Sequence, residues 1–228
     1  MEQAPETGCV PKHVNTRTRA RLVGSLSVSL ASLCLCLNGA FSAPASGNYA
    51  RQDDAASKLT EGAFTPPPPA FALFCERFSH QCLRSGAAET IRLDPFRWSQ
   101  LVKVNATVNR RIKPKPEPAG VDVWTINAHE GDCDAFAIEK RKELLDLGWP
   151  SASLSLTVAY ARESEAHLVL TVRTDRGEYL LDNLRNAVVG VNDVSYRFVM
   201  RQSAIHPRLW VMISDAQTLK ASTVALSH

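Results

Sequence analysis

The sequence predicts an α+β protein in which helices come first and the strands of an antiparallel sheet follow. Apolar residues recur at spacings of three and four over residues 71–85 and 96–112, which is typical of helices buried on one side. After Pro150 the pattern changes to short runs rich in β-branched residues. Asp175-Arg176-Gly177 separates two of these runs and is a hairpin signal, so neighbouring strands are expected to be antiparallel.

A third helix is predicted to begin at Cys133. Asp132 is a suitable N-cap residue, and the apolar residues that follow can share one buried side. Gly148 and Pro150 then end the helix. Before it, a proline-rich stretch predicts a stiff, extended connection that leads to Trp124. Strands are expected at residues 154–160, 167–174, 179–182, 196–202 and 209–213.

Residues 1–45 have the order of a secretory signal peptide. Arginines precede an apolar run over residues 22–37, and small residues follow it. Cleavage is expected after Ser42 or Ala45. An uncleaved anchor is the alternative, although the serines in the apolar run make it a weak transmembrane helix. We therefore predict an exported, periplasmic protein.

The rest of the chain divides into a leader, one domain and a tail. Residues 46–70 are rich in small and polar residues and end in a run of prolines, which predicts a disordered or extended leader. Residues 71–215 are expected to form one domain, and residues 216–228 a C-terminal tail. The formal net charge of +3 includes the basic signal region, and no basic stripe with interleaved aromatics is present. This pattern argues against a nucleic-acid partner.

The cysteine count depends on the signal peptide. Its removal leaves Cys75, Cys82 and Cys133. Export would allow Cys75 and Cys82 to form a disulfide. The alternative is that they lie two turns apart on one helix, where they cannot bridge unless the helix breaks between them. If they do pair, Cys133 is the odd cysteine, and an odd cysteine in an exported chain is a candidate reactive thiol.

The position of Cys133 is compatible with a nucleophile. In the first turn of a helix, backbone N–H groups and the helix dipole favour a thiolate over a thiol. Asp132 and Asp134 oppose this effect because their charges disfavour another anion nearby. A buried structural cysteine is the other interpretation, since cysteine is among the most buried residue types.

A thiol nucleophile needs a histidine to move the proton and a third group to orient that histidine. The candidate bases are His80, His129, His167 and His206. His167 is favoured over the loop residue His129, because it begins a predicted strand whose backbone would fix the ring. Asp182 on the next strand is the favoured orienting group, since a carboxylate among apolar residues needs a partner. Asn183 is its rival.

The distance between these two residues is the weak point of the prediction. With a two-residue loop at Arg176-Gly177, Asp182 would face Thr171. It would then lie roughly 13 Å along the strand from His167, at ~3.3 Å per residue. A bulge, a bend or a different register is needed to close that gap.

Four motifs together resemble those of the bacterial transglutaminase-like cysteine proteinases, a family that includes the LapG-type periplasmic proteases. They are Gly131-Asp132-Cys133-Asp134, the run from Glu139 to Pro150, His167 with the residues after it, and Leu181-Asp182-Asn183-Leu184. The resemblance implies a papain-like fold with N-terminal helices packed on the sheet. It also implies Cys133 as nucleophile, His167 as general base and acid, and Asp182 as the residue that orients His167. Trp124 resembles an aromatic residue that flanks the active site of the family.

LapG-type members bind calcium through a Gly-Asp-Cys-Glu-Asp motif. This chain has Asp134 where the motif has Glu, and Ala135 where it has the last Asp. Calcium takes six to eight oxygen ligands, so these changes are expected to weaken the site. The chemistry itself requires no cofactor, and calcium binding through Asp132 and Asp134 is kept as a hypothesis.

The resemblance implies a periplasmic cysteine endopeptidase that hydrolyses peptide bonds through a thioester intermediate. The expected substrate is a cell-surface adhesin or another protein of the cell envelope, and the expected regulatory partner is an inner-membrane receptor. Two alternatives stay open. One is a catalytically idle envelope module that binds a partner through the same cleft. The other is a protein-glutamine amine transferase, which would use the same acyl-enzyme with an amine in place of water.

Overall fold

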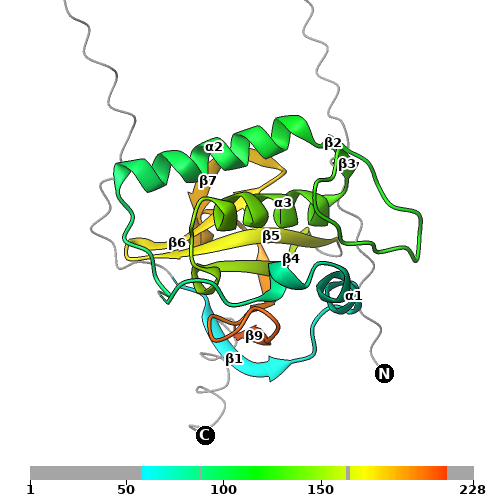
Figure 1. Ribbon diagram of the computed structural model, residues 1–228, viewed down its shortest axis with the longest axis horizontal. Coiled ribbons are helices and arrows are strands. Elements are labelled where there is room, and N and C mark those ends of the chain that lie inside the picture. The colour runs from blue at the N-terminus through cyan, green and yellow to red at the C-terminus, as the bar shows by residue number, and fades with distance from the viewer. Residues whose placement is uncertain (1–57, 88, 163–164, 215–228) are drawn as a thin grey trace, which may run out of the picture. The chain divides into compact units, whose positions relative to one another are not determined.

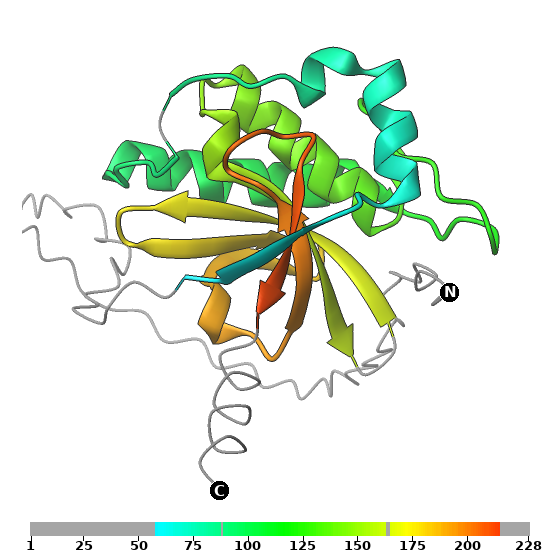
Figure 2. The ribbon, with the colours of Figure 1, turned by 90° about the horizontal axis from the view of Figure 1, so that it is seen from below.

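A curved antiparallel sheet carries helices on one of its faces, and this arrangement confirms the predicted α+β class (Figures 1 and 2). The computed structural model describes residues 58–87, 89–162 and 165–214. The α-helices are α1 (Pro69–Arg77), α2 (Pro95–Arg111) and α3 (Cys133–Asp146). Short 3-10 helices are formed by Ser79–Cys82, Ser151–Ser153 and Val191–Asp193.

The main sheet has seven strands in the order β1-β9-β8-β4-β5-β6-β7. Their bounds are β1 (Thr60–Thr65), β4 (Leu154–Arg162), β5 (Glu165–Thr174), β6 (Gly177–Asp182), β7 (Arg185–Gly190), β8 (Arg197–Gln202) and β9 (Trp210–Ser214). A second, two-stranded sheet pairs β2 (Lys113–Pro114) with β3 (Glu130–Gly131) in parallel. The parallel pair fixes the point at which the chain enters α3.

Helix α3 lies at the centre of the fold, against β5 and beside α2 (Figure 1). It begins at Cys133, and the side chain of Asp132 caps it by accepting the Asp134 N–H at 3.3 Å. Gly148, with a φ of 84°, follows its C-terminus in the left-handed conformation that glycine adopts without strain. The start and end of this helix therefore agree with the sequence prediction.

The fold begins earlier in the chain than the sequence predicted. Residues 60–65, within the expected leader, form β1 and pair with β9. The side chains of β1 are exposed or only partly buried, so the strand lacks the alternating apolar pattern that marks a half-buried strand. The expected signal region at 1–45 and the tail at 216–228 lie outside the described residues. Within the described part of the chain, no helix is long and apolar enough to span a membrane.

A break after α1 brings Cys75 and Cys82 into a disulfide, with their Cα atoms 5.7 Å apart. Helix α1 ends at Arg77, Phe78 is not helical, and the 3-10 turn Ser79–Cys82 reverses the chain. The two cysteines thus do not lie two turns apart on one helix. The buried guanidinium of Arg141 on α3 fixes this turn by donating to the carbonyl oxygen of Gln81 at 2.8 Å.

The β5–β6 hairpin has a register different from the expected one. Thr174 pairs with Gly177, so the two-residue loop is Asp175-Arg176 rather than Arg176-Gly177. Leu181 pairs with Leu170, which places Asp182 one step further, beside Val169. Asp182 therefore lies only two residues along the strand from His167. This shift of register halves the expected gap, and the hydrogen bond between the two side chains spans the rest.

Candidate active site

His167 and Asp182 form a buried hydrogen-bonded pair. The distance from His167 Nε2 to Asp182 Oδ1 is 2.8 Å, and the side chains are 2% and 0% exposed. Asp182 is the last residue of β6, and His167 lies near the start of β5. Because Nε2 faces the carboxylate, Nδ1 is the ring nitrogen that can act on a thiol. The pair therefore has the arrangement in which a carboxylate orients an imidazole.

The Asp182 carboxylate receives donors on both oxygens. Besides His167, the Leu184 N–H donates to Oδ1 at 3.0 Å. The Tyr196 hydroxyl donates to Oδ2 at 2.6 Å, and the Arg185 Nε lies 3.4 Å from the same oxygen. Burial raises the pKa of Asp182, but the hydrogen bonds and charge of its partners prevail and lower the pKa to about 2. Asp182 is therefore ionised at neutral pH.

Cys133 lies against the strand that carries His167. Its sulfur atom accepts the backbone N–H of Leu168, the residue after His167, at 3.2 Å. Cys133 is also the first residue of α3 and is fully buried. The structure thus brings Cys133, His167 and Asp182 to one corner of the molecule, where α3, β5 and β6 meet.

The other candidate residues lie elsewhere. His80 and His129 are exposed, and the His129 carbonyl accepts the Lys113 N–H at the β2–β3 pair. His206 is half-buried and accepts the Arg208 N–H through Nδ1. Asn183, the rival orienting group, is half-buried, and it is Asp182 that contacts His167.

Trp124 is a core residue of the loop before α3. Its ring is buried, packs edge-on against Phe71 with centroids 5.9 Å apart, and belongs to the same apolar cluster as Cys133. The indole N–H donates to Asp122 Oδ1 at 2.7 Å, and the Trp124 carbonyl accepts Arg77 Nη2. Trp124 therefore links the core below Cys133 to an acidic loop. Its role in a substrate cleft stays a prediction.

Three carboxylates converge beside the start of α3. Oxygen atoms of Glu117, Asp122 and Asp134 all lie within 4.8 Å of one another. Burial raises the pKa of each, and burial together with the charges of neighbouring carboxylates raises that of Asp134 to about 10. Asp132 lies outside this group, although its side chain accepts the Asp134 N–H and its charge acts on Asp134.

The acidic set therefore differs from the pair expected from the sequence. It shares Asp134 with that pair and adds Glu117 and Asp122, from the proline-rich connection before Trp124. No local motif marks these two residues, because they reach Asp134 only through the fold of the connection. Hard oxygen ligands of this kind suit calcium, so the residues present fit a calcium ion.

A comparison with protein-family models assigns most of the chain to one family. Residues 61–218 match the model described as bacterial transglutaminase-like cysteine proteinase BTLCP. This chain belongs to the bacterial transglutaminase-like cysteine proteinases. Its membership supports the general function of a transglutaminase-like cysteine peptidase.

Solved structures of LapG from Legionella pneumophila are similar to this proteinase. One is 27% identical, with a TM-score of 0.45, and the match covers 58% of this chain and 77% of that chain. The calcium-bound LapG structure is 24% identical, with a TM-score of 0.46, and the match covers 58% of this chain and 82% of that chain. A search of curated proteins found no match.

Helix α3 of the proteinase also carries a buried lysine that the sequence reading missed. Lys140 follows Cys133 by about two turns of the helix and is 0% exposed. Its Nζ has no hydrogen-bond partner among the described residues, and it lies 5.9 Å from the centroid of the Phe136 ring. Burial lowers the pKa of Lys140 to about 7, against the opposite effect of the Asp182 charge. Only the tertiary structure reveals that Lys140 is buried, because a lysine in a sequence usually indicates a solvent-exposed face.

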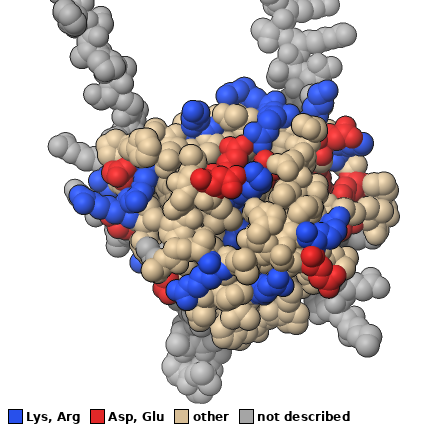
Figure 3. All heavy atoms as spheres, viewed as in Figure 1, with Lys and Arg blue, Asp and Glu red and all other residues tan. Residues whose placement is uncertain are grey.

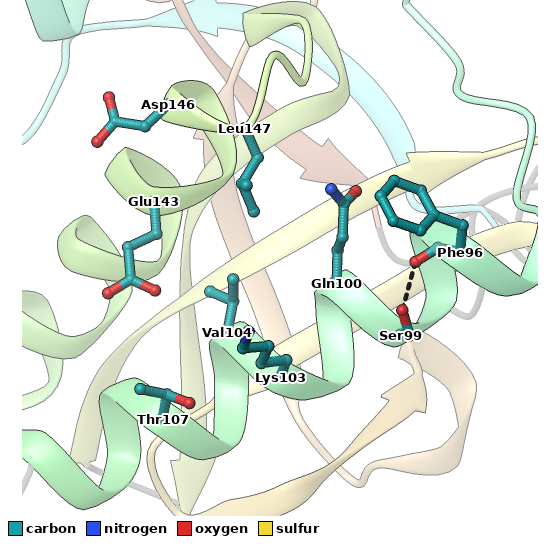
Figure 4. Close-up of a pocket in the computed structure, with 9 residues that line it drawn as sticks. All are labelled: Phe96, Ser99, Gln100, Lys103, Val104, Thr107, Glu143, Asp146 and Leu147. Carbon is teal, nitrogen blue, oxygen red and sulfur yellow. Dashed lines mark hydrogen bonds between the residues drawn. The ribbon is translucent and has the colours of Figure 1, made fainter.

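A cavity of about 520 Å³ lies away from this corner of the proteinase, between α2 and α3 (Figure 4). Exposed Phe96 and Leu147 stand on either side of it, and no candidate catalytic residue lines it. A second cavity, of about 450 Å³, has Tyr196 in its wall. On the face seen in Figure 3, acidic and basic side chains are interspersed, and several pair between or along α2 and α3.

Proposed function

We propose that this protein is an endopeptidase that hydrolyses peptide bonds through Cys133, His167 and Asp182. The observation that carries the proposal is the buried hydrogen bond of 2.8 Å between His167 Nε2 and Asp182 Oδ1. The sulfur of Cys133 lies close to this pair, since it accepts the backbone N–H of Leu168, the residue after His167. An ionised carboxylate, an oriented imidazole and a cysteine at a helix N-terminus, in its reduced form, are the groups that acyl transfer by a cysteine needs.

In the proposed reaction, His167 Nδ1 takes the proton of the Cys133 thiol, and the sulfur attacks the carbonyl carbon of the peptide bond. Backbone N–H groups at the start of α3 are the candidate donors to the resulting oxyanion. The tetrahedral intermediate collapses to a thioester, and the amine leaves with the proton from His167. Water then attacks the thioester with His167 as base, which releases the acid and restores the thiol. Throughout, Asp182 orients the ring and stabilises its protonated form.

Calcium is proposed as a structural ion that stabilises the fold and takes no part in the chemistry. Glu117, Asp122 and Asp134 would hold the ion, with backbone carbonyls or water as further ligands. The support is the proximity of these carboxylates, whose pKa values are raised by burial and by the charges of nearby carboxylates, Asp132 among them. A bound cation would remove that repulsion and fix the loop that leads to Cys133. It would supply no reacting atom.

The location, substrate and regulatory partner are proposed from the sequence. The signal-like N-terminus supports export to the periplasm. An exported endopeptidase would meet proteins of the cell envelope, such as a surface adhesin, and an inner-membrane receptor could control it there. Fractionation of cells, followed by detection of the mature chain, tests the location. Recovery of the chain in the cytoplasm alone would contradict export.

The triad is tested with an alkylating activity probe and a peptide library. With the protein kept reduced, we expect the probe to label Cys133 in the wild-type protein and labelling to fall by at least about a hundredfold in His167→Ala. His129→Ala is the matched control, because His129 is exposed and its side chain lies outside the buried pair. The Asp182→Asn variant should keep its fold and lose most of its turnover. Equal labelling of the wild type and His167→Ala would refute the triad.

The same acyl-enzyme allows an experiment that separates hydrolysis from amine transfer. Incubation with a glutamine peptide and a labelled primary amine should give no labelled peptide if the protein is a peptidase. Incorporation of the amine would assign transferase activity instead. Tight capture of an envelope protein without turnover of any peptide would indicate an idle binding module.

A further inference from the structure

We propose that Tyr196 is a positioning residue that holds Asp182 and His167 in their paired arrangement. The inference rests on the proposed function, since it assumes that this pair serves catalysis. Tyr196 lies between the 3-10 turn Val191–Asp193 and β8, outside the elements that carry the triad. It therefore approaches the pair from a separate part of the chain.

The first contact of Tyr196 is with the carboxylate of Asp182. The two carboxylate oxygens have different partners: Oδ1 contacts His167 and the Leu184 N–H, whereas Oδ2 accepts the Tyr196 hydroxyl at 2.6 Å and has the Arg185 Nε further away, at 3.4 Å. The terminal torsion of an aspartate is soft, so contacts on Oδ1 alone fix the plane of the carboxylate less well than contacts on both oxygens. A bond on the far oxygen fixes it more firmly, and keeps Oδ1 directed at His167.

The second contact of Tyr196 is with the imidazole itself. The rings of His167 and Tyr196 meet edge to face, with centroids 5.8 Å apart and an interplanar angle of 89°. This is a favourable geometry for two aromatic rings. One side chain therefore restrains both members of the pair, through its hydroxyl and through its ring.

Arg185 determines the direction of the hydroxyl bond. Its Nη2 lies 3.3 Å from the Tyr196 hydroxyl oxygen, and its guanidinium carbon lies 5.4 Å from the ring centroid. A guanidinium can only donate, so the tyrosine oxygen accepts from Arg185 and its own proton goes to Asp182. Burial, followed by the contact with Asp182, raises the pKa of Tyr196 to about 12, so the hydroxyl keeps its proton at neutral pH.

The test removes the hydroxyl and keeps the ring. In Tyr196→Phe we expect kcat for peptide hydrolysis to fall about tenfold to a hundredfold, because a hydrogen bond to a charged group is lost at the catalytic pair. KM should stay within about twofold, since the role assigned to Tyr196 is exerted on the enzyme's own pair. The urea midpoint should fall modestly, because the donor to a buried carboxylate is lost, and the variant should stay folded under the assay conditions. In Tyr196→Leu, which also removes the ring, kcat should fall further.

Tyr179→Phe is the matched control. Tyr179 is another half-buried tyrosine, and its ring meets Trp98 edge to face at 5.2 Å, remote from Asp182 in its contacts. It should leave kcat, KM and the urea midpoint unchanged.

Three results for Tyr196→Phe would overturn the inference. They are a wild-type kcat, a raised KM with unchanged kcat, or a loss of kcat that merely follows a loss of stability. Cys133→Ala is measured alongside to separate this inference from the proposed function. An active Cys133→Ala variant would refute the function, whereas an inactive one beside a wild-type Tyr196→Phe would refute the positioning role alone.

Discussion

At the scale of single residues, two buried charged groups, Asp182 and Lys140, differ in whether they have hydrogen-bond partners among the described residues. Asp182 is buried, but donors on both of its oxygens keep its pKa at about 2. Lys140 is equally buried and has no hydrogen-bond partner among the described residues, and its pKa falls to about 7. A buried charge without partners costs stability, whereas a buried charge with matched partners can be retained at little cost.

Replacement of Lys140 should stabilise the fold in a pH-dependent way. The pKa falls from 10.5 in the unfolded chain to about 7 in the fold. Below pH 7 both states are protonated and the cost is complete; between the two values only the unfolded state holds the proton, so stability rises with pH. Lys140→Met should therefore raise the free energy of unfolding by roughly 1 kcal/mol or more at acidic pH.

Urea unfolding at several pH values between 6 and 10 measures this effect. The advantage of Lys140→Met should shrink as the pH approaches the unfolded pKa of 10.5. Lys103→Met, which replaces an exposed lysine of α2, is the control and should show no such trend. A gain that is constant over the whole pH range would contradict the assigned pKa.

At the scale of elements, the N-terminus of α3 meets the acidic loop and the β5–β6 hairpin. The sequence predicted where this helix starts, because Asp132 is a local N-cap signal and Gly148 a local stop. It did not predict the partners of the helix. Glu117 and Asp122 reach Asp134 from the proline-rich connection, and Tyr196 reaches Asp182 from the segment that precedes β8. Such contacts form only when the whole chain folds, and no periodic pattern in the sequence indicates them.

Calcium should stabilise this element. We expect saturating calcium to raise the melting temperature by about 3 to 8 °C, because the ion binds the folded acidic site and relieves repulsion among its carboxylates. Glu117→Gln and Asp122→Asn should reduce the shift in a thermal melt with calcium against one with chelator. Glu130→Gln, at an exposed acid paired with Lys115, should retain it. If calcium raises the melting temperature of Glu117→Gln as much as that of the wild type, Glu117 is not a calcium ligand.

At the scale of the whole molecule, an ion network of two buried arginines, one buried glutamate and the partly exposed Glu61 joins the sheet to its N-terminal edge. Glu61 of β1 contacts Arg173 Nη2 at 2.5 Å and Arg201 Nε at 2.8 Å. Arg201 also pairs with Glu178 of β6 at 2.6 Å. Strand β1 lies at one end of the strand order and β6 near the other, so these contacts show how strongly the sheet curls (Figure 2).

Removal of the charge on Glu61 should weaken the fold without touching the catalytic pair. Glu61→Gln leaves Arg173 and Arg201, both buried, with less compensating charge. We expect a loss of about 1 to 3 kcal/mol in the free energy of unfolding, below the value for a fully buried pair because Glu61 is 31% exposed. Urea denaturation measures it, and Glu89→Gln, at an exposed acid, is the control. An unchanged midpoint would mean that Glu178 alone balances both arginines.

The sequence by itself determined the fold class, the start of α3, most of the sheet strands and the family. These features depend on local signals: helix caps, the period of apolar residues and motifs read in order. It missed β1 and β7, whose side chains are mostly exposed or only half-buried and give no alternating apolar pattern.

Only the tertiary structure decided which residues meet. The hairpin register brought Asp182 within reach of His167, and the break after α1 brought Cys75 to Cys82. The acidic triplet and the contacts of Tyr196 likewise join segments distant in the chain. The physical reason is common to all of them. A periodic pattern specifies which face of an element is buried, whereas register and long-range contacts depend on how many elements pack together at once.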